Sequence, residues 1–321
     1  MSALPPTPLL SAVVVSYKTR ELTLECLRVL TAELRSLQAE ILVVDNASAD
    51  GSADAVRTAF PEVRLLENAH NAGFGAANNL ALRKARGRYL LLLNTDAFPR
   101  PEAVRRLVDV LVQNPAAGVV GPRLLHADGS LQQSCFRFPS PAHAWCENLG
   151  LTRLGRWFVR LDDYRRWDHA TERAVDFVIG ACLLLRREVY EQVGGFDERF
   201  FMYQEEADWQ KRIRDAGWQV LFTPEAEVVH LAGASGKAEP ARVSGHFFES
   251  LDKYTLKHHG WPGFLLVRGA MLLGCSVRAL GWAALALAAP RRRPTAARRA
   301  RQHLWLVDRQ LRTGPPVGGR A

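Results

Sequence analysis

Apolar residues occur in short runs that end abruptly in polar residues, a pattern typical of strands buried on both faces of a parallel sheet. The stretches between these runs have helical periodicity, so strands and helices alternate along the first hundred residues. The expected strands are at 9–17, 41–45, 63–67 and from Tyr89 to Asn94, and the expected helices are at 21–37, 53–59 and 75–85. This alternation favours parallel pairing and helices on both faces of the sheet. The pattern therefore predicts an α/β fold with a Rossmann-like nucleotide-binding sheet.

The second half of the chain is less regular, but it continues the same domain. We expect a helix after Pro101, a strand over 175–186, a helix ending at Val193, a helix over 205–216 and a strand within 219–230. Residues 126–170 are rich in Trp, Arg and Pro, which suggests a mobile or acceptor-facing loop region. We expect one domain over 1–262, with a nucleotide-binding half at about 9–100 and an acceptor half at 101–262.

Charge separates this domain from residues 263–321, which hold eleven arginines against one acid, Asp308, while the chain as a whole carries a net charge of +9. The domain itself is close to neutral. Five widely spaced cysteines without a Cys-x-x-Cys pair indicate reduced, cytosolic thiols. The first residues lack the basic and apolar regions of a secretory signal, so we expect the catalytic domain to face the cytoplasm.

Candidate binding residues stand at the carboxyl ends of two expected strands. One strand ends in Asp45, Asn46, Ser48 and Asp50, and the other ends in Asn94 and Asp96. In open α/β sheets this edge is the expected ligand position, so both clusters point to one nucleotide derivative. Asp45 has the chemistry to accept hydrogen bonds from a base or ribose, and Asp96 to bind a divalent cation that also holds a diphosphate. Taken singly, these residues fit turn capping as well.

Two further segments carry candidate chemistry. Glycines in the loop from Asn71 to Asn79 allow the backbone to approach a ligand at a helix start. The acids Glu205, Glu206 and Asp208 crowd another helix start, where the macrodipole stabilises negative charge. At about 100° per residue Glu205 and Asp208 share a face and Glu206 does not, and Asp208 can pair with Arg212. One free carboxylate there would suit a general base.

His230 ends the last expected strand, where an imidazole could join a metal site or serve the structure alone.

The chain resembles the family 2 glycosyltransferases of the rhamnosyltransferase-like branch, which build bacterial surface polysaccharides. The resemblance covers about residues 10–260. Its motifs, in order, are Val14-Val15-Ser16-Tyr17, Val44-Asp45-Asn46-Ala47-Ser48-x-Asp50-Gly51-Ser52, Asn71-x-Gly73-Phe74-Gly75-x-x-Asn78, Leu93-Asn94-Thr95-Asp96, Gly180-Ala181 and Gly195-Phe196-Asp197-x-x-Phe200-Phe201.

The resemblance implies a GT-A fold and an inverting, metal-dependent transferase that uses Mg²⁺ or Mn²⁺. The implied donor is a nucleotide sugar, with dTDP-rhamnose as the first guess, and the implied acceptor is a lipid-linked glycan or polysaccharide of the cell envelope. The implied donor-binding residues are Ser16, Tyr17, Asp45, Asn46, Ser48, Asp50, Asn71, Gly73, Phe74, Asn78, Asn94 and Asp96.

The remaining implied roles concern the metal, the base and the acceptor side. Asp96 and His230 match the family's metal-binding positions. The family's Glu-Asp-x-Asp motif reads Glu205-Glu206-Ala-Asp208 here, which favours Glu206 as the base without excluding Glu205. Asn94 stands in place of the first Asp of the Asp-x-Asp motif. Asp197, Asp208 and Arg212 are expected to be acceptor-side or structural.

Residues 264–289 are almost wholly apolar but contain Arg268 and Arg278, and arginine clusters follow. Because a central arginine costs a spanning helix about 3 kcal/mol or more, the pattern favours an amphipathic segment on an anionic membrane surface, at the inner face of the cell membrane. A helical pair that packs on the domain is the alternative. Two other functions stay open: a catalytically silent nucleotide-sugar or glycan-binding homologue, and a nucleic-acid-binding protein that uses the basic tail. The neutral domain argues against nucleic acid.

Overall fold

The computed structural model describes residues 7–151, 164–231 and 240–314. The chain divides into two compact units, one of Met1–Phe138 with Tyr164–Ser250 and one of Pro139–Asp163 with Leu251–Ala321. The second unit therefore begins before the expected boundary at residue 262, and it also includes a segment from the middle of the chain.

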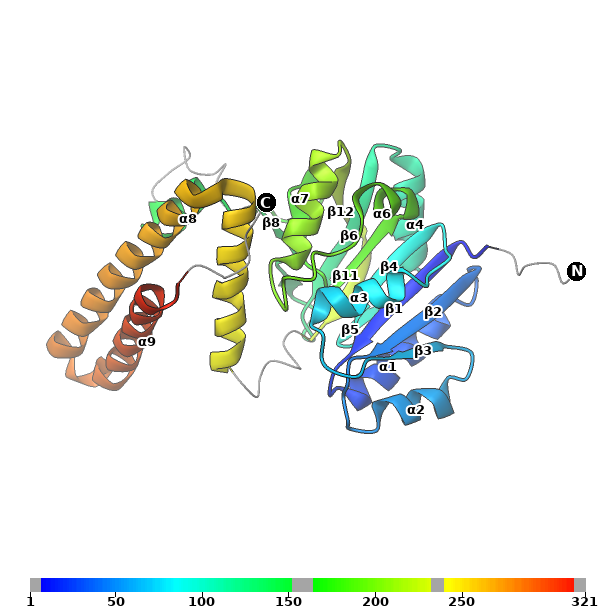
Figure 1. Ribbon diagram of the computed structural model, residues 1–321, viewed down its shortest axis with the longest axis horizontal. Coiled ribbons are helices and arrows are strands. Elements are labelled where there is room, and N and C mark those ends of the chain that lie inside the picture. The colour runs from blue at the N-terminus through cyan, green and yellow to red at the C-terminus, as the bar shows by residue number, and fades with distance from the viewer. Residues whose placement is uncertain (1–6, 152–163, 232–239, 315–321) are drawn as a thin grey trace, which may run out of the picture. The chain divides into compact units, whose positions relative to one another are not determined.

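The first unit is built on a ten-stranded mixed sheet with helices on both faces (Figure 1). Four parallel strands form one side: β1 (Leu10–Ser16), β2 (Ala39–Asp45), β3 (Arg64–Glu67) and β4 (Tyr89–Asn94). The strand order is β3-β2-β1-β4-β11-β6-β12-β5, with β7 and β9 paired at the side. The remaining strands are β5 (Ala97–Pro99), β6 (Ala117–Leu125), β7 (Leu131–Gln132), β9 (Arg173–Val175), β11 (Cys182–Arg186) and β12 (Gln219–His230).

Both faces of the central strands are buried, which explains why their sequences are continuous apolar runs rather than alternating ones. Neighbouring residues of a strand point to opposite faces, so Val14 and Leu91 enter one core cluster while Val13 and Leu92 enter the other. Helices that cover the two faces are α1 (Arg20–Glu33), α2 (Ser52–Ala59) and α4 (Ala103–Gln113) on one side, and α3 (Phe74–Leu82), α6 (Arg187–Val193) and α7 (Glu205–Asp215) on the other.

The single strand expected over 175–186 is wrong, because the structure splits it. β10 (Phe177–Val178) pairs with β8 (Cys135–Phe136) in a separate small sheet, whereas β11 pairs with β4 and β6 in the main sheet. Between them, Ile179 donates its N–H to Ser134, and Ala181 accepts a hydrogen bond from Asn94. The backbone is thus held by two different neighbours, and the apolar pattern alone does not register the change.

Residues 126–151, expected to be irregular, contain β7, β8 and α5 (Pro141–Asn148). The rest of that segment lies outside the described residues up to Asp163. The first helix is also shorter than expected, because it ends at Glu33.

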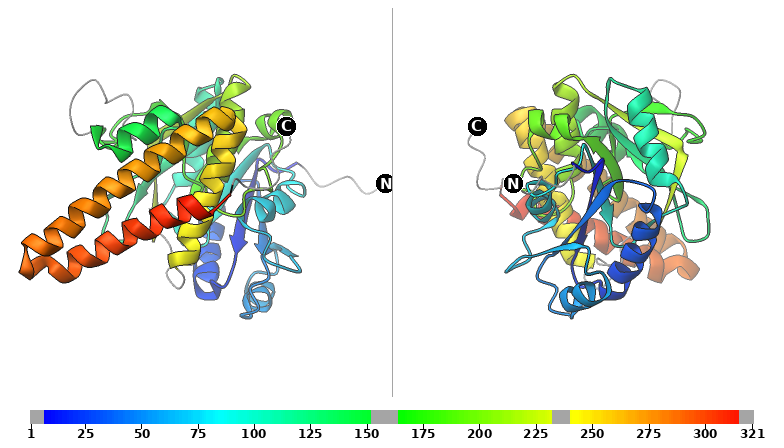
Figure 2. Two further views of the ribbon diagram at one scale, coloured as in Figure 1. Left: turned by 60° about the vertical axis from the view of Figure 1, so that its left-hand side comes forward. Right: turned by 90° about the vertical axis from the view of Figure 1, so that its right-hand side faces the viewer.

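The second unit is helical. It contains α5, the part of α8 (Pro240–Ala288) from Leu251 onward, the turn η3 (Pro290–Arg292) and α9 (Arg293–Arg312). α8 kinks at Gly260, whose φ is 63°, just before Pro262. Beyond the kink, α8 and α9 run side by side as a hairpin (Figures 1 and 2). Within the described residues, the helical stretch Gly245–Ala288 is long and apolar enough to cross a membrane by length and composition, and an 18-residue window of it has a mean hydropathy of 1.6.

Gln210 connects α7 to β10 and supplies a test of this packing. Its buried side chain accepts a hydrogen bond from Val178 N–H at 2.9 Å and donates one to Val178 C=O at 2.7 Å, as a neighbouring strand would. Gln210→Leu leaves both backbone groups unpaired, so we expect a loss of about 2 kcal/mol or more in the free energy of unfolding. Urea denaturation measures the free energy of unfolding, and the control is Gln113→Leu, at an exposed position of α4. Equal stability of the two variants would contradict the role given to Gln210.

Candidate active site

The carboxyl ends of three adjacent strands bring the expected donor-binding residues together. In the strand register Ser16 lies beside Asp45, and Val15 lies beside Asn94. Asp45 is almost fully buried, and its Oδ2 accepts a hydrogen bond from the Ser48 N–H at 3.2 Å. Its Oδ1 is buried without a hydrogen-bond partner among the described residues. A buried acceptor of this kind is costly unless a ligand supplies the donor, such as a base N–H or a ribose hydroxyl.

Asn46 organises the loop that follows β3. Its Nδ2 donates to Asn71 Oδ1 at 2.9 Å and to Gly73 C=O at 3.3 Å, while its Oδ1 accepts from Asn68 Nδ2 and Ala72 N–H. The amide is buried and these contacts occupy both of its ends. The side chain therefore shapes the loop from the inside and has little capacity left for a ligand.

Glycine is required at position 73. Its φ is 85°, and a Cβ there would collide with the Phe201 backbone. The next residue, Phe74, donates its N–H to the Phe201 carbonyl at 2.9 Å. This contact fixes the start of α3 against the segment that leads into α7, so the loop and the acidic helix start are held together.

Several of the expected donor residues have partners inside the fold. Ser16 Oγ bonds Thr23 Oγ1, Ser48 Oγ donates to Ser16 C=O, and Asn78 Nδ2 donates to Phe74 C=O. The Asp50 carboxylate accepts from Ser52 and from the Arg20 N–H, and Tyr17 is half-buried with the Lys18 ammonium over its ring. These contacts stabilise the edge of the sheet around Asp45.

Asp96 and His230, which are far apart in the sequence, meet at one end of the sheet. Asp96 precedes β5, and β5 pairs with the end of β12 so that Ala97 lies beside His230. The carboxylate Oδ1 and the imidazole Nε2 are 3.3 Å apart, and both side chains are mostly buried.

Gln132 defines which imidazole nitrogen carries the proton. Its Nε2 contacts the His126 ring nitrogen at 3.2 Å and the His230 carbonyl at 3.4 Å, so its Oε1 faces His230 Nδ1 at 2.8 Å. An amide oxygen only accepts, and Nδ1 therefore donates. In a neutral imidazole the lone pair then lies on Nε2, facing the carboxylate of Asp96.

Two acceptors this close need either a second proton on His230 or a cation between them. An imidazole nitrogen with a carboxylate oxygen suits Mn²⁺ or Mg²⁺, with phosphate and water as the usual further ligands. No group of three His, Cys, Asp or Glu side chains gathers as a ready metal cage in the described part of the chain. The two residues thus offer two ligand atoms to such an ion, and its other ligands would have to come from a bound molecule or water.

The acids at the start of α7 lie in unlike surroundings. Glu205 is nearly closed off from solvent, whereas Glu206 is partly exposed and its carboxylate accepts a hydrogen bond from the Gly180 N–H. Burial, and then the charge of Glu206, raise the pKa of the Glu205 carboxyl well above the usual glutamate range. Burial also raises the pKa of Glu206, against the lowering effect of its backbone hydrogen bonds. Both carboxylates have an Oε2 without a hydrogen-bond partner among the described residues.

Backbone geometry presents these acids. Tyr203 and Gln204, just before α7, have φ of 68° and 64°, a conformation that is strained for such side chains. Nearby, Gly75 packs closely against Phe196 and Gly180 against the Phe74 ring, because a Cβ built at these glycines would lie 3.0 Å from Phe196 Cβ and 3.3 Å from the ring.

Asp208 and Arg212 form the expected i, i+4 ion pair. Arg212 Nε donates to Asp208 Oδ2 at 3.0 Å, and its other nitrogens donate to the carbonyls of Val193 and Gly195. Asp208 is fully buried. Asp197 instead pairs with Arg199 at 2.6 Å. The contacts of Arg212 fasten α7 to the turn after α6.

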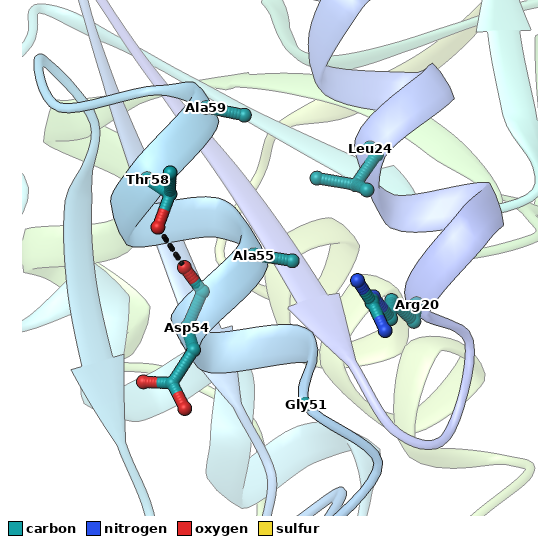
Figure 3. A pocket seen from close by; sticks show the side chains of 7 residues that line it. All are labelled: Arg20, Leu24, Gly51, Asp54, Ala55, Thr58 and Ala59. Carbon is teal, nitrogen blue, oxygen red and sulfur yellow. Dashed lines mark hydrogen bonds between the residues drawn. The ribbon is translucent and has the colours of Figure 1, made fainter.

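A separate surface hollow of about 500 Å³ lies between α1 and α2 (Figure 3). Arg20, Leu24, Gly51, Asp54, Ala55, Thr58 and Ala59 line it. None of the candidate donor, metal or base residues is among them, so it is not the site described above.

Gln132 is the site residue that sequence reasoning missed. It follows a turn at Asp128 and Gly129, and nothing in its local pattern separates it from a surface glutamine. Only the pairing of β7 with β6, which lies beside β12, brings it to His230. The hydroxyl contact from Thr19 to Thr95, 3.1 Å long, is equally invisible in the sequence.

Comparison with known proteins identifies the family. The family model described as "Glycosyl transferase family 2" matches residues 11–194. An N-acetylglucosaminyl-diphospho-decaprenol L-rhamnosyltransferase of Mycobacterium tuberculosis (strain CDC 1551 / Oshkosh) is 31% identical over 252 residues, covering 73% of this chain and 81% of that protein. The dTDP-rhamnosyl transferase RfbF of Shigella flexneri is 24% identical over 229 residues, 69% of each chain.

A likeness in fold accompanies these matches. The mannosyltransferase PcManGT from Pyrobaculum calidifontis, solved with GDP-Man and Mn²⁺, covers 96% of this chain and 88% of its own, with a TM-score of 0.56 and 20% identity. The expected GT-A fold is confirmed by the family match and this likeness. The chain therefore belongs to glycosyl transferase family 2 and is a glycosyltransferase.

Proposed function

We propose that this glycosyltransferase moves a sugar, with L-rhamnose from dTDP-rhamnose as the first candidate, to a lipid-linked glycan acceptor in cell-envelope synthesis. The observation that carries the proposal is the close approach of Asp96 Oδ1 to His230 Nε2, two atoms able to bind a metal ion. The buried Oδ1 of Asp45, at the carboxyl end of the same sheet, has no hydrogen-bond partner among the described residues. Both rhamnosyltransferase relatives suggest the sugar, and the mycobacterial one, which acts on a diphospho-decaprenol, suggests the acceptor class. With a lipid-linked acceptor, we expect the enzyme to work on the cytoplasmic face of the membrane.

In the proposed reaction, the carboxylate of Glu206 accepts the proton of a hydroxyl group on the acceptor substrate. The oxygen of that hydroxyl bonds to the anomeric carbon of the donor sugar. The bond from that carbon to the diphosphate oxygen breaks, and the nucleoside diphosphate leaves with the electron pair. A single displacement of this kind inverts the anomeric configuration. A bound Mg²⁺ or Mn²⁺ supplies charge neutralisation on the leaving diphosphate.

The other residues orient the donor. We assign the Asp45 carboxylate to hydrogen bonds with the base or ribose, and the Asn71 to Phe74 loop, held by Asn46, to the donor's approach. Glu205 is assigned as the protonated member of the acidic pair, because its burial and the neighbouring charge raise its pKa further. Glu206 is assigned as the base, because it is partly exposed and its pKa is raised less than that of Glu205.

Asp96→Ala tests the donor and metal assignment. Purified protein with Mn²⁺ and dTDP-rhamnose should transfer rhamnose to a sugar-diphospho-polyprenol, with the product followed by mass spectrometry. We expect the rate of transfer by Asp96→Ala to fall at least about a hundredfold, because the variant lacks one of the two side chains proposed to hold the metal. Its unliganded melting temperature should stay close to that of exposed Asp109→Ala.

Two results would contradict these assignments. Substantial metal-dependent turnover by Asp96→Ala would remove Asp96 from the metal site. If the wild-type protein transfers from no nucleotide sugar but gains thermal stability from one with metal present, the silent-homologue alternative is favoured instead. Salt-sensitive DNA binding, with no effect of any nucleotide sugar on thermal stability, would favour the nucleic-acid alternative.

Glu206→Gln tests the base. We expect the variant to bind donor normally and to lose about 10²- to 10⁴-fold in kcat, whereas Glu205→Gln keeps most of it. The wild-type kcat/KM should fall as pH decreases through a pKa above the usual glutamate range, because protonation removes the base and burial raises that pKa. Full loss in Glu205→Gln with activity kept in Glu206→Gln would transfer the role to Glu205.

Gln132→Leu tests whether the glutamine positions His230. Without the acceptor on Nδ1, the imidazole loses its fixed tautomer, and we expect Mn²⁺ affinity in the presence of dTDP to weaken about 10- to 100-fold. Electron paramagnetic resonance of free Mn²⁺ measures it on folded protein. Gln132→Glu keeps an acceptor and should restore binding. A lower melting temperature with unchanged Mn²⁺ affinity would reduce Gln132 to a structural residue.

A further inference from the structure

The helix α8 exposes an apolar stripe beyond its kink. Its members are solvent-exposed, from 45% for Leu273 to 81% for Leu287. We define the stripe as Trp261, Leu265, Leu266, Leu273, Val277, Leu280 and Leu287. At about 100° per residue these seven side chains fall within one broad face of the helix, and at about 1.5 Å per residue the face is about 40 Å long. So large an exposed apolar face marks an interaction site.

The two arginines within this apolar helix lie off the stripe and are bound inside the second unit. Arg268 donates to Gln310 Oε1 at 3.1 Å and to the Thr313 carbonyl at 2.7 Å, with Asp252 3.6 Å away. Arg278 donates to the carbonyl and the side chain of Asn148 at 2.8 Å and 2.7 Å. The stripe is consequently free of charge, although the sequence of the helix is not.

The neighbouring helix α9 adds a basic face. Arg298, Arg301 and Arg312 are exposed and lie within about 60° of one another around that helix, with Trp305 among them. Asp308, which pairs with Arg312 at 2.6 Å, is the acid of this helix. The hairpin thus combines a long apolar face with a cationic one, the composition of a segment that lies in the interface of an anionic bilayer.

Two alternatives fit less well. If α8 spanned the membrane, α9 would follow it into the hydrocarbon, because Arg268 ties the helices together and the Arg299 guanidinium stacks on Trp282 at 4.6 Å. The exposed arginines of α9 would then lose their water at high cost. A second copy of the chain on the stripe would bring basic helices of like charge close together.

We propose that the α8–α9 hairpin lies in the plane of an anionic membrane surface, with the stripe in the acyl boundary and the α9 arginines at the lipid headgroups. The use of this membrane binding, which is access to a lipid-linked acceptor, rests on the proposed function, whereas the binding itself does not. Each arginine near such a surface contributes about 1 kcal/mol of attraction.

Vesicle sedimentation of the full chain tests the proposal. Wild-type protein should bind phosphatidylcholine vesicles that contain phosphatidylglycerol, and should bind pure phosphatidylcholine less. Leu273→Glu with Leu280→Glu should lower binding by about tenfold or more, because two apolar side chains leave the bilayer. The matched control is Val112→Glu, at an equally exposed valine of α4, which should bind as wild type does. Arg298→Gln with Arg301→Gln should remove much of the preference for anionic lipid.

Three outcomes would overturn the proposal. The first is unchanged vesicle binding by the double leucine variant. The second is that the wild type is a dimer, the double leucine variant is a monomer, and both bind vesicles. The third is that wild-type protein bound to membranes resists extraction with alkaline carbonate. The second outcome would assign the stripe to a copy of the chain, and the third would mean that α8 spans.

Donor-induced thermal stabilisation separates the two proposals. It should be the same in wild type and in the leucine variant, because the donor residues lie in the first unit. Its absence from both proteins would contradict the proposed function and leave the membrane proposal standing.

Discussion

The meeting of Asp96 and His230 is the constraint on which the rest of the site depends. A carboxylate oxygen and an imidazole nitrogen 3.3 Å apart form a stable pair only with a proton or a cation between them. The mixed sheet creates this situation, because the chain leaves β4, turns at Asp96 and forms β5 against the end of β12. A mostly buried pair of this kind at the carboxyl end of the sheet is suited to a charged ligand. The unpartnered oxygen of Asp45 at the same edge points to the same requirement.

The acidic start of α7 is a second place where charges are held close together at an energetic cost. Two adjacent glutamates in a buried setting repel each other, and the favourable end of the helix dipole offsets only part of that cost. The backbone before the helix adopts positive φ angles at Tyr203 and Gln204 and still brings both acids to this position. Such an arrangement gives the two carboxyls different proton affinities, so that one can stay neutral while the other accepts a proton. The difference between the two pKa values follows from the surroundings, since the side chains are identical.

The sequence predicted the features that depend on local pattern. The four parallel strands and the strand-end acids follow from short apolar runs that end in polar residues, and the i, i+4 pair of Asp208 and Arg212 follows from the helical period of 3.6 residues. Gln132 and the break between β10 and β11 did not, because they depend on which distant segments become neighbours. Asn46 illustrates the same limit, since an amide at a strand end suits either a ligand or a loop. Only the four contacts found in the fold distinguish the two uses.

The tail illustrates how composition and structure divide the argument. By composition, α8 is apolar enough to span a bilayer, and its two arginines count as a cost against that. In the structure the two arginines form hydrogen bonds with Gln310, Thr313 and Asn148. The exposed apolar stripe can therefore enter the bilayer boundary without carrying these charges with it. What argues against spanning is therefore the basic helix that those links bring along. A lipid-linked acceptor carries its diphosphate at headgroup level, and an enzyme that lies on the surface can reach that level without crossing the membrane.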